Sequence, residues 1–415
     1  MTSKRWTILL TGCAAALTIG ACGVPERPAE APVQVEAEVE MDPQAVELTQ
    51  RFLLIDTHID VPYRLNDHPA DVGGRTEGGD FDFPRAVAGG LDVLFMSIYV
   101  PAEYQETGGA KDFATEMIAL VEGIAAEHSD KFTMVASADE AAAVQGSGKL
   151  GFAMGIENGA PIEGDLANLQ YFYDKGVRYI TLTHSENNHI CDSSYTTERT
   201  WNGLSPFGRE LVAEMNKIGM LIDISHVSDA AFVQVLELTN APVIASHSSC
   251  RHFTPGWERN MSDEMIAALG DNGGVIQINF GSSFLRGDSQ KQGTAYWIAR
   301  ETYVAEHQLA ADSEQLVMWD ETYWSDKKKL YADVTDVADH IDRVVELAGI
   351  DQVGIGSDFD GVGDSLPTGL KDVSQYPNLI AVLIERDYSE EDIEKICSGN
   401  LMRVWREAER IATGS

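Results

Sequence analysis

Histidines and carboxylates follow apolar stretches along this chain, and the first of them are a pair. The stretch "LLIDTHID", residues 53–60, finishes on His58 and Asp60. Side chains two positions apart lie on the same face of a strand, so both can reach one small volume. Imidazole and carboxylate groups together could bind a metal ion. A single His-x-Asp pair is a weak motif, and its meaning depends on the residues at the ends of the other apolar stretches.

Six of eight such stretches end in a side chain that binds metal or transfers protons. The residues at these ends are His58, Asp60, Glu157, His184, His226, His247 and Asp358. The chain has 10 histidines, and four of them stand at such ends. Burying so many imidazoles and carboxylates together would be costly without a cation to organise them. The pattern therefore predicts a metal site.

The ligand types indicate which metal and which chemistry to expect. Imidazole and carboxylate without thiolate suit zinc, and less often manganese, cobalt or iron. After residue 22 the cysteines are Cys191, Cys250 and Cys397, which form no thiolate metal motif. The candidates outnumber the ligands of one tetrahedral site, so two metals sharing a carboxylate is the simplest arrangement. Two metals about 3.5–4 Å apart can ionise a water and polarise a carbonyl, which is chemistry for hydrolysis.

The sequence predicts that strands alternating with helices position these side chains. The eight apolar stretches are "FLLIDTHID", "LDVLFMSIYV", "GFAMGIEN", "VRYITLTH", "GMLIDISHV", "APVIASHSS", "GGVIQINF" and "QVGIGSDFDG". Continuous rather than alternating apolar residues are typical of a parallel sheet covered on both faces. Between them, residues 205–219 and 335–349 have helical patterns, the first with Ser205 as cap, Pro206 in the first turn and Gly219 at the end. We expect an α/β fold, a (β/α)8 TIM-type barrel of the metallo-dependent hydrolase kind, with an open doubly wound sheet as the alternative.

Residues 283–333 interrupt this alternation. The segment is long, polar and aromatic, with Trp297, Trp319, Tyr323 and Trp324. We interpret it as an insertion in the loop after the seventh strand.

The N-terminus predicts export and anchoring. Residues 1–22 have a basic start, an apolar stretch and small residues before Cys22, which indicates a signal peptide rather than a membrane span. The residues before Cys22 resemble a bacterial lipobox; Cys13 also fits but leaves too short an apolar region, and an ordinary signal peptide is the alternative. Residues 23–45 are rich in Pro, Ala and Glu and predict a flexible tether, followed by one barrel domain over 46–415.

The predicted location is the periplasmic face of the cell envelope, with a lipid on Cys22 as the link to the membrane. Gly23, rather than Asp, follows the cysteine and favours the outer membrane. The formal charge of −36 disfavours binding to nucleic acid and to anionic lipid surfaces.

Several stretches resemble the renal (membrane) dipeptidase family of binuclear zinc peptidases. They are "IDTHIDVPY", "MGIENG", "ITLTHSENN", "DISHVSD", "VIASHSS", "RNMSDE", "GIGSDFDG" and "SGNLMRVW", in the family's order, within about residues 50 to 406. The chain is thus similar to a bacterial, lipoprotein-type member. The resemblance implies a zinc-dependent dipeptidase that cleaves dipeptides with a free C-terminal carboxylate through a hydroxide bridging two Zn2+ ions. It also implies that residues 46–415 form a metallopeptidase domain.

The resemblance also implies a role for each site residue. His58 and Asp60 would bind one zinc, His226 and His247 the other, and Glu157 would bridge them. His184 would contact the substrate and stabilise the tetrahedral intermediate, Arg259 would pair with the substrate carboxylate, and Asp358 would be the acid–base residue. Family members are commonly homodimers, although no segment of this sequence establishes a dimer.

Alternatives remain open at this point. Asp360 could be the active carboxylate in place of Asp358, and Arg259 could be a surface ion pair. We expect His189, His252 and His340 to lie outside the direct ligand set. The chain could be another binuclear amidohydrolase acting on lactams or cyclic amides, although those usually begin with His-x-His. It could also be a tethered binding lipoprotein without turnover, but that predicts a missing ligand and none is missing.

Overall fold

A computed structural model of the chain describes residues 41–310 and 313–414, and it contains a parallel barrel. The barrel strands are β1 (Ile55–Ile59), β2 (Val93–Tyr99), β4 (Leu150–Glu157), β5 (Val177–Thr181), β6 (Leu221–Asp223), β7 (Ile244–Ser248), β8 (Val275–Ile278) and β9 (Val353–Ile355). Each pairs in parallel with the next in this order. They coincide with the eight apolar stretches. A further short strand, β3 (Phe132–Met134), pairs with β4 outside the barrel path and was not expected from the sequence.

The barrel closes where its last strand meets its first. Ile59 and Phe359 form an isolated parallel bridge. The amide of Asp60 donates to the carbonyl of Phe359 at 2.9 Å, and the amide of Asp358 donates to the carbonyl of His58 at 3.0 Å. The predicted (β/α)8 barrel is therefore confirmed and nearly closed, and the open doubly wound alternative is wrong because β9 returns to β1.

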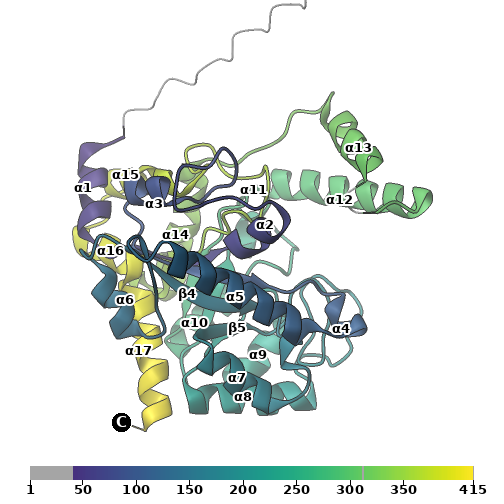
Figure 1. Cartoon of the computed structure of the whole chain (residues 1–415), viewed down its shortest axis with the longest axis horizontal. Coiled ribbons are helices and arrows are strands. Elements are labelled where there is room, and N and C mark those ends of the chain that lie inside the picture. Colours follow the sequence, from purple (N-terminus) through teal and green to yellow (C-terminus); the bar gives the residue numbers. More distant parts are fainter. Residues whose placement is uncertain (1–40, 311–312, 415) are drawn as a thin grey trace, which may run out of the picture. The chain divides into compact units, whose positions relative to one another are not determined.

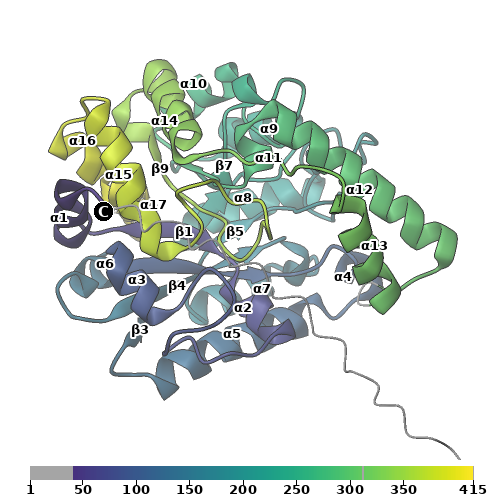
Figure 2. The same ribbon diagram turned by 90° about the horizontal axis from the view of Figure 1, so that it is seen from above.

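Helices surround the strands, as seen from two directions in Figures 1 and 2. They are α1 (Pro43–Arg51), α2 (Val61–Asp67), α3 (Phe83–Gly89), α4 (Tyr104–Thr107), α5 (Ala110–Glu127), α6 (Ala138–Val144), α7 (Leu166–Asp174), α8 (Pro206–Ile218), α9 (Asp229–Leu238), α10 (Asp263–Asn272), α11 (Ser282–Leu285), α12 (Gly287–His307), α13 (Glu314–Trp324), α14 (Val334–Ala348), α15 (Tyr376–Glu385), α16 (Glu390–Glu394) and α17 (Asn400–Thr413). The two helices expected from sequence punctuation are α8 and α14. Ser205 caps α8 by accepting from the amide of Gly208, and Gly219 ends it in a left-handed conformation.

Aromatic rings fill the barrel interior below the site. Trp405 of α17 lies 5.2 Å from Phe95, and Phe95 stacks on Tyr179 at 5.3 Å between ring centroids. The hydroxyl of Tyr179 then reaches Nδ1 of His58 at 2.9 Å. All four side chains are fully buried. This continuous packing makes the position of His58 depend on the barrel core, because close-packed rings leave little room for adjustment.

The aromatic insertion forms two helices, α12 and α13, that extend away from the barrel in both views (Figures 1 and 2). Their rings pack mainly on one another; for example, Tyr296 lies 5.2 Å from Trp324 and Tyr303 stacks on Trp319 at 5.2 Å. Trp297 stays 55% exposed. The insertion therefore does not disrupt the alternation of strands and helices in the barrel.

Most of the predicted N-terminal segments lie outside the described residues. This holds for the signal peptide, for Cys22 and for the tether as far as residue 40, while α1 begins at Pro43. Among the residues that the structure describes, no helix is long and apolar enough to span a bilayer.

Candidate metal centre and active site

The carboxyl ends of the barrel strands bring the predicted site residues together. His58 and His247 lie within β1 and β7, and Glu157 is the last residue of β4. The remaining predicted residues stand in loops that directly follow strands: Asp60, His184, His226, Arg259 and Asp358. Parallel strands present their carboxyl ends at one rim of a barrel, so residues far apart in sequence meet there.

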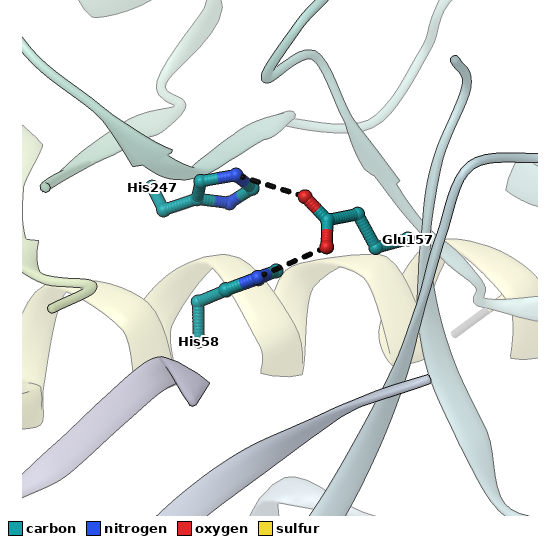
Figure 3. Close-up of side chains that lie close together, drawn as sticks. All are labelled: His58, Glu157 and His247. Carbon is teal, nitrogen blue, oxygen red and sulfur yellow. Dashed lines mark ion pairs between the residues drawn. The ribbon is translucent and has the colours of Figure 1, made fainter. Parts of the chain in front are cut away.

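Glu157 lies at the centre of the cluster. Its Oε2 is 3.4 Å from Nε2 of His58, and its Oε1 is 3.2 Å from Nε2 of His247, so one oxygen faces each ring (Figure 3). Oε1 also lies 3.1 Å from Nε2 of His226 and 3.6 Å from Nε2 of His184. A carboxylate with histidines on both oxygens is placed to bridge two cations.

Ligand atoms within 4.8 Å of one another form three sets. They are His58, Glu157 and His247; Glu157, His184 and His226; and His58, Asp60 and Asp358. Every metal ligand expected from the sequence belongs to at least one set. The geometry also includes His184 and Asp358, to which the resemblance gives other roles, so the division of ligands between two metals stays a prediction.

Hydrogen bonds orient two of the imidazoles toward the cluster. The Tyr179 hydroxyl donates to the carbonyl of Thr57 at 3.1 Å, so it accepts from Nδ1 of His58. Ser246 Oγ donates to Asp223 at 2.6 Å and accepts from Nδ1 of His247 at 2.8 Å. In a neutral ring whose proton lies on Nδ1, the lone pair is on Nε2, which is the atom that both histidines direct toward Glu157 and the atom that a metal ligand requires.

The buried Nε2 of His58 has no hydrogen-bond partner among the described residues. A buried acceptor without a partner is unfavourable unless something else binds it. The donor set of imidazoles and carboxylates, with Nε2 atoms directed inward, therefore fits a zinc-like metal.

The electrostatics of Glu157, His226 and His247 favour the protonation states that bind metal. Burial raises the pKa of Glu157, but the neighbouring His58 and His184 and hydrogen bonds from His226 and His247 outweigh it, so the pKa lies well below the usual range. Burial lowers the pKa values of His226 and His247 well below those of free imidazole. An ionised carboxylate between neutral imidazoles is the state in which these groups act as ligands.

His58 differs from these three residues. Burial lowers its pKa, but Tyr179 and the carboxylates of Glu157 and Asp60 outweigh burial and raise the pKa well above that of free imidazole. A bound cation would therefore have to displace a proton there.

Asp358 faces the cluster and Asp360 does not. The amide of Asn279 donates to Oδ2 of Asp358 at 2.6 Å, and burial together with the charge of Asp60 raises the pKa of Asp358. Asp360 instead accepts from the amide of Asp80 at 2.6 Å and pairs with Arg64 at 2.9 Å. The geometry favours Asp358 over Asp360 as the active carboxylate.

The backbone at the site is unusual in a way the sequence did not reveal. His226, Asp358 and Asp360 have φ of 68°, 65° and 65°, in the left-handed region that residues with a side chain rarely occupy. Such conformations cost about 1–3 kcal/mol each and persist only where the surrounding structure imposes them. His226 and Asp358 both belong to the sets of candidate ligands, so the loops after β6 and β9 hold these two side chains at the site through a constrained backbone.

Arg259 is a buried guanidinium rather than a surface ion pair. Its side chain donates to Ser248 Oγ at 2.7 Å and to the carbonyl of His247 at 2.7 Å, and it lies 3.0 Å from Nε2 of His226. The residue is 2% exposed. These hydrogen-bond partners are uncharged groups, and among the described residues the Nε of Arg259 has no hydrogen-bond partner. The surface-pair alternative is therefore wrong.

Other residues that serve the site were not found by sequence reasoning. Asp56, within β1, and Asp223, the last residue of β6, are fully buried and accept from the backbone amides of Ser357 and Ser246 respectively. The sequence does indicate that both residues are unusual, since each is an acidic residue inside an otherwise apolar stretch. The remaining histidines lie outside the cluster: His340 accepts from the amide of Cys250 at 2.9 Å, for example.

The fold and the site together define a class of protein. A nearly closed parallel barrel that gathers imidazoles and carboxylates at its carboxyl rim has the architecture of a metal-dependent barrel hydrolase. The chain belongs to the membrane dipeptidase family, peptidase family M19, whose sequence profile matches residues 43–415.

Individual relatives agree with this assignment. An uncharacterized dipeptidase of Schizosaccharomyces pombe is 33% identical over 88% of this chain and 83% of its own length. The crystal structure of a probable dipeptidase, PvdM, from Pseudomonas aeruginosa is similar with 28% identity and a TM-score of 0.76, over 89% of this chain and 98% of that one. A metallopeptidase from Rhodobacter sphaeroides, solved with a phosphinate mimic of the dipeptide L-Ala-D-Ala, has 25% identity and a TM-score of 0.69, over 86% and 99%.

Proposed function

We propose that this chain hydrolyses the peptide bond of dipeptides with a free C-terminal carboxylate, using two zinc ions. The observation that carries the proposal is the buried guanidinium of Arg259 beside the histidine cluster, where its hydrogen-bond partners among the described residues are a serine hydroxyl, a backbone carbonyl and an imidazole rather than a carboxylate. A buried cation without a counter-charge is strongly unfavourable, so an anion belongs there in the working state. A carboxylate matches the guanidinium with two parallel hydrogen bonds.

Within this proposal His58 and Asp60 would hold one zinc, His226 and His247 would hold the other, and Glu157 would serve both. When bound, the two ions would polarise the scissile carbonyl and lower the pKa of a water. The inward-facing Nε2 atoms of His58 and His247 support this assignment.

The other side chains bind and orient the substrate. Arg259 holds the terminal carboxylate, which places the peptide bond over Glu157. His184 is partly exposed, with a side-chain exposure of 21%, so its ring can meet substrate and donate to the oxygen of the attacked carbonyl. Asp358, held by Asn279, takes the proton of the attacking water and delivers it to the leaving amine. The peptidase solved with a mimic of L-Ala-D-Ala supports a dipeptide as substrate.

Replacing Arg259 by Ala should mainly raise KM for free dipeptides, because the guanidinium holds the carboxylate in the ground and transition states alike. Loss of a buried charge-assisted pair costs about 2–5 kcal/mol, which corresponds to about 30-fold or more in KM. Steady-state kinetics on a dipeptide panel, with and without chelator, measures this. Dipeptides with an amidated C-terminus should behave on the unaltered enzyme as free dipeptides do on Arg259→Ala. Arg406→Ala, which removes an exposed arginine of α17, is the matched control.

Equal cleavage of free and amidated dipeptides would contradict the role of Arg259. Full activity after exhaustive chelation would contradict the metal-dependent reaction itself. The two outcomes are independent, so carboxylate binding and metal dependence are tested separately.

We also propose that the protein is exported and lipid-anchored through Cys22. The motif Ile19-Gly20-Ala21-Cys22 supports this. Cys22→Ser should therefore move the protein from the membrane fraction to the soluble fraction, with kcat/KM unchanged, as measured by fractionation and mass spectrometry of the N-terminus. Cys13→Ser is the matched control and should leave the location unchanged. Wild-type protein found without acyl chains would contradict the lipobox prediction.

A further inference from the structure

Three aromatic side chains form a continuous wall beside Arg259, and the reaction described above uses none of them. The ring of Phe284 lies 5.1 Å from Cζ of Arg259. Trp257 lies 5.1 Å from Phe284, and Tyr195 lies 6.2 Å from Trp257 in an edge-to-face arrangement. We call Tyr195, Trp257 and Phe284 the aromatic wall.

The aromatic wall reaches the cluster of candidate metal ligands through Tyr195. The ring of Tyr195 lies 5.8 Å from the ring of His226. The amide of Ser194 donates to the carbonyl of His226 at 2.8 Å, which fixes this part of the loop after β5 against the loop after β6. Tyr195 is nevertheless 43% exposed, so a large ring beside the buried cluster remains open to incoming molecules.

An ion pair fixes the two loops that carry Tyr195 and Trp257 relative to each other. Arg199 pairs with Glu258, the residue between Trp257 and Arg259, and also donates to the carbonyl of Ser193. The second oxygen of Glu258 accepts from the amide of Asp229 at 2.8 Å. The loop after β5 and the loop after β7 are therefore linked directly at Glu258, between Trp257 and Arg259.

The chemistry of a dipeptide places one of its side chains at this wall. The α-carbon of the C-terminal residue carries both the carboxylate and the side chain. When the carboxylate lies on Arg259, that side chain must lie within reach of the groups surrounding the guanidinium. Aromatic faces bind apolar groups well, and they offer no charge to a polar side chain.

We propose that Tyr195 and Trp257 determine specificity for the C-terminal residue of the substrate, favouring dipeptides with a large apolar residue there. The inference rests on the proposed dipeptidase function and deepens it, because it concerns the residue held by Arg259. Trp257 supplies the apolar surface. Tyr195 supplies a second face and a hydroxyl that interacts with the guanidinium of Arg259.

Three dipeptides test the proposal: L-Ala-Gly, L-Ala-L-Phe and L-Phe-Gly. On the unaltered enzyme, kcat/KM for L-Ala-L-Phe should exceed that for L-Ala-Gly by about tenfold or more, the scale of a filled apolar subsite. Trp257→Ala should remove most of that advantage and change L-Ala-Gly and L-Phe-Gly by less than about threefold. Trp257→Phe should restore the preference, because it retains an aromatic face. Trp297→Ala, on the exposed insertion, is the matched control and should change none of the three.

Tyr195 is tested in two parts. Tyr195→Phe keeps the ring and should raise KM for all three dipeptides by a similar factor of about ten or less, because it removes a hydrogen bond to a charged group. Tyr195→Ala should in addition reduce the preference for L-Ala-L-Phe. Tyr303→Phe, which removes a hydroxyl in the insertion, should have no effect.

The outcomes separate this inference from the proposed function. If L-Ala-Gly is hydrolysed but the Trp257 and Tyr195 variants keep the wild-type ratio between L-Ala-L-Phe and L-Ala-Gly, the specificity role is overturned and the dipeptidase function stands. If Trp257→Ala lowers kcat/KM for L-Phe-Gly as much as for L-Ala-L-Phe, the aromatic wall contacts the N-terminal residue of the substrate, and the inference is wrong. If the unaltered enzyme hydrolyses none of the dipeptides, both proposals are overturned. Hydrolysis of L-Ala-Gly by each variant shows that it is folded.

Discussion

Replacing Glu157 by Gln should deplete metal from both halves of the site at once and abolish most hydrolysis. One oxygen of Glu157 faces His58 and the other faces His226 and His247. An amide turns one of these two acceptors into a donor, so the side chain can no longer bridge two cations. Loss of a group that only supports a ligand costs about 10–100-fold in metal affinity, so loss of a shared ligand should exceed about 100-fold.

Elemental analysis after dialysis measures the result. Wild-type protein should carry close to two equivalents of zinc-like metal, and Glu157→Gln should carry fewer than one. Glu301→Gln, an exposed glutamate of α12, is the matched control and should keep both equivalents. Two full equivalents in Glu157→Gln would contradict the bridging role.

Asp358→Asn should lower kcat while the metal stays bound. Asp358 is proposed to move protons as the tetrahedral intermediate forms and collapses, and general acid–base groups contribute about 10²–10⁴-fold. Asparagine tolerates the left-handed backbone at this position, so the substitution removes the proton-transfer group without straining the turn. Asp358→Asn should therefore retain metal content and KM within a few-fold.

Asp360→Asn provides a matched control two residues away. Asp360 has the same φ of 65°, but its carboxylate bonds to the amide of Asp80 and to Arg64 rather than to the metal cluster. This variant should keep near-normal kcat and show a lower melting temperature, since it weakens a buried ion pair. Kinetics, elemental analysis and thermal unfolding on both variants distinguish the two carboxylates. Near-normal turnover of Asp358→Asn with loss in Asp360→Asn would reverse the assignment.

The barrel and the cluster were predictable because their signals are local. A continuous apolar stretch predicts a buried parallel strand, and the residue after it must lie at the carboxyl rim of a barrel. His58, Glu157 and His247 could thus be placed together from the sequence without knowledge of any contact. Most of the stretches that resemble the membrane dipeptidase family contain these same strand ends.

The parts that could not be predicted depend on tertiary contacts. Ser246 and Tyr179 orient the imidazoles of His247 and His58, but a serine or a tyrosine within an apolar stretch carries no signal of a partner. The aromatic wall joins loops more than fifty residues apart, and only the folded chain brings Tyr195 to Trp257. The left-handed backbone at His226 is likewise imposed by the loops that surround it, because no intrinsic preference of histidine requires it.

The contacts between β1 and the segment after β9, which close the barrel, have a consequence for the order of folding. The amide of Ser357 donates to the carboxylate of Asp56, which is 301 positions away in the chain, and the next residue, Asp358, donates its amide to the carbonyl of His58 in β1. Joining segments so distant carries a large loop-closure entropy, so this pairing is expected to form after the local β/α units. A cation bound by His58 and Asp60 at this edge would stabilise the closed ring by mass action, because the open chain offers no assembled site. Metal binding and the final step of folding would then occur together, because the cation would connect the end of β1 to the loop after β9.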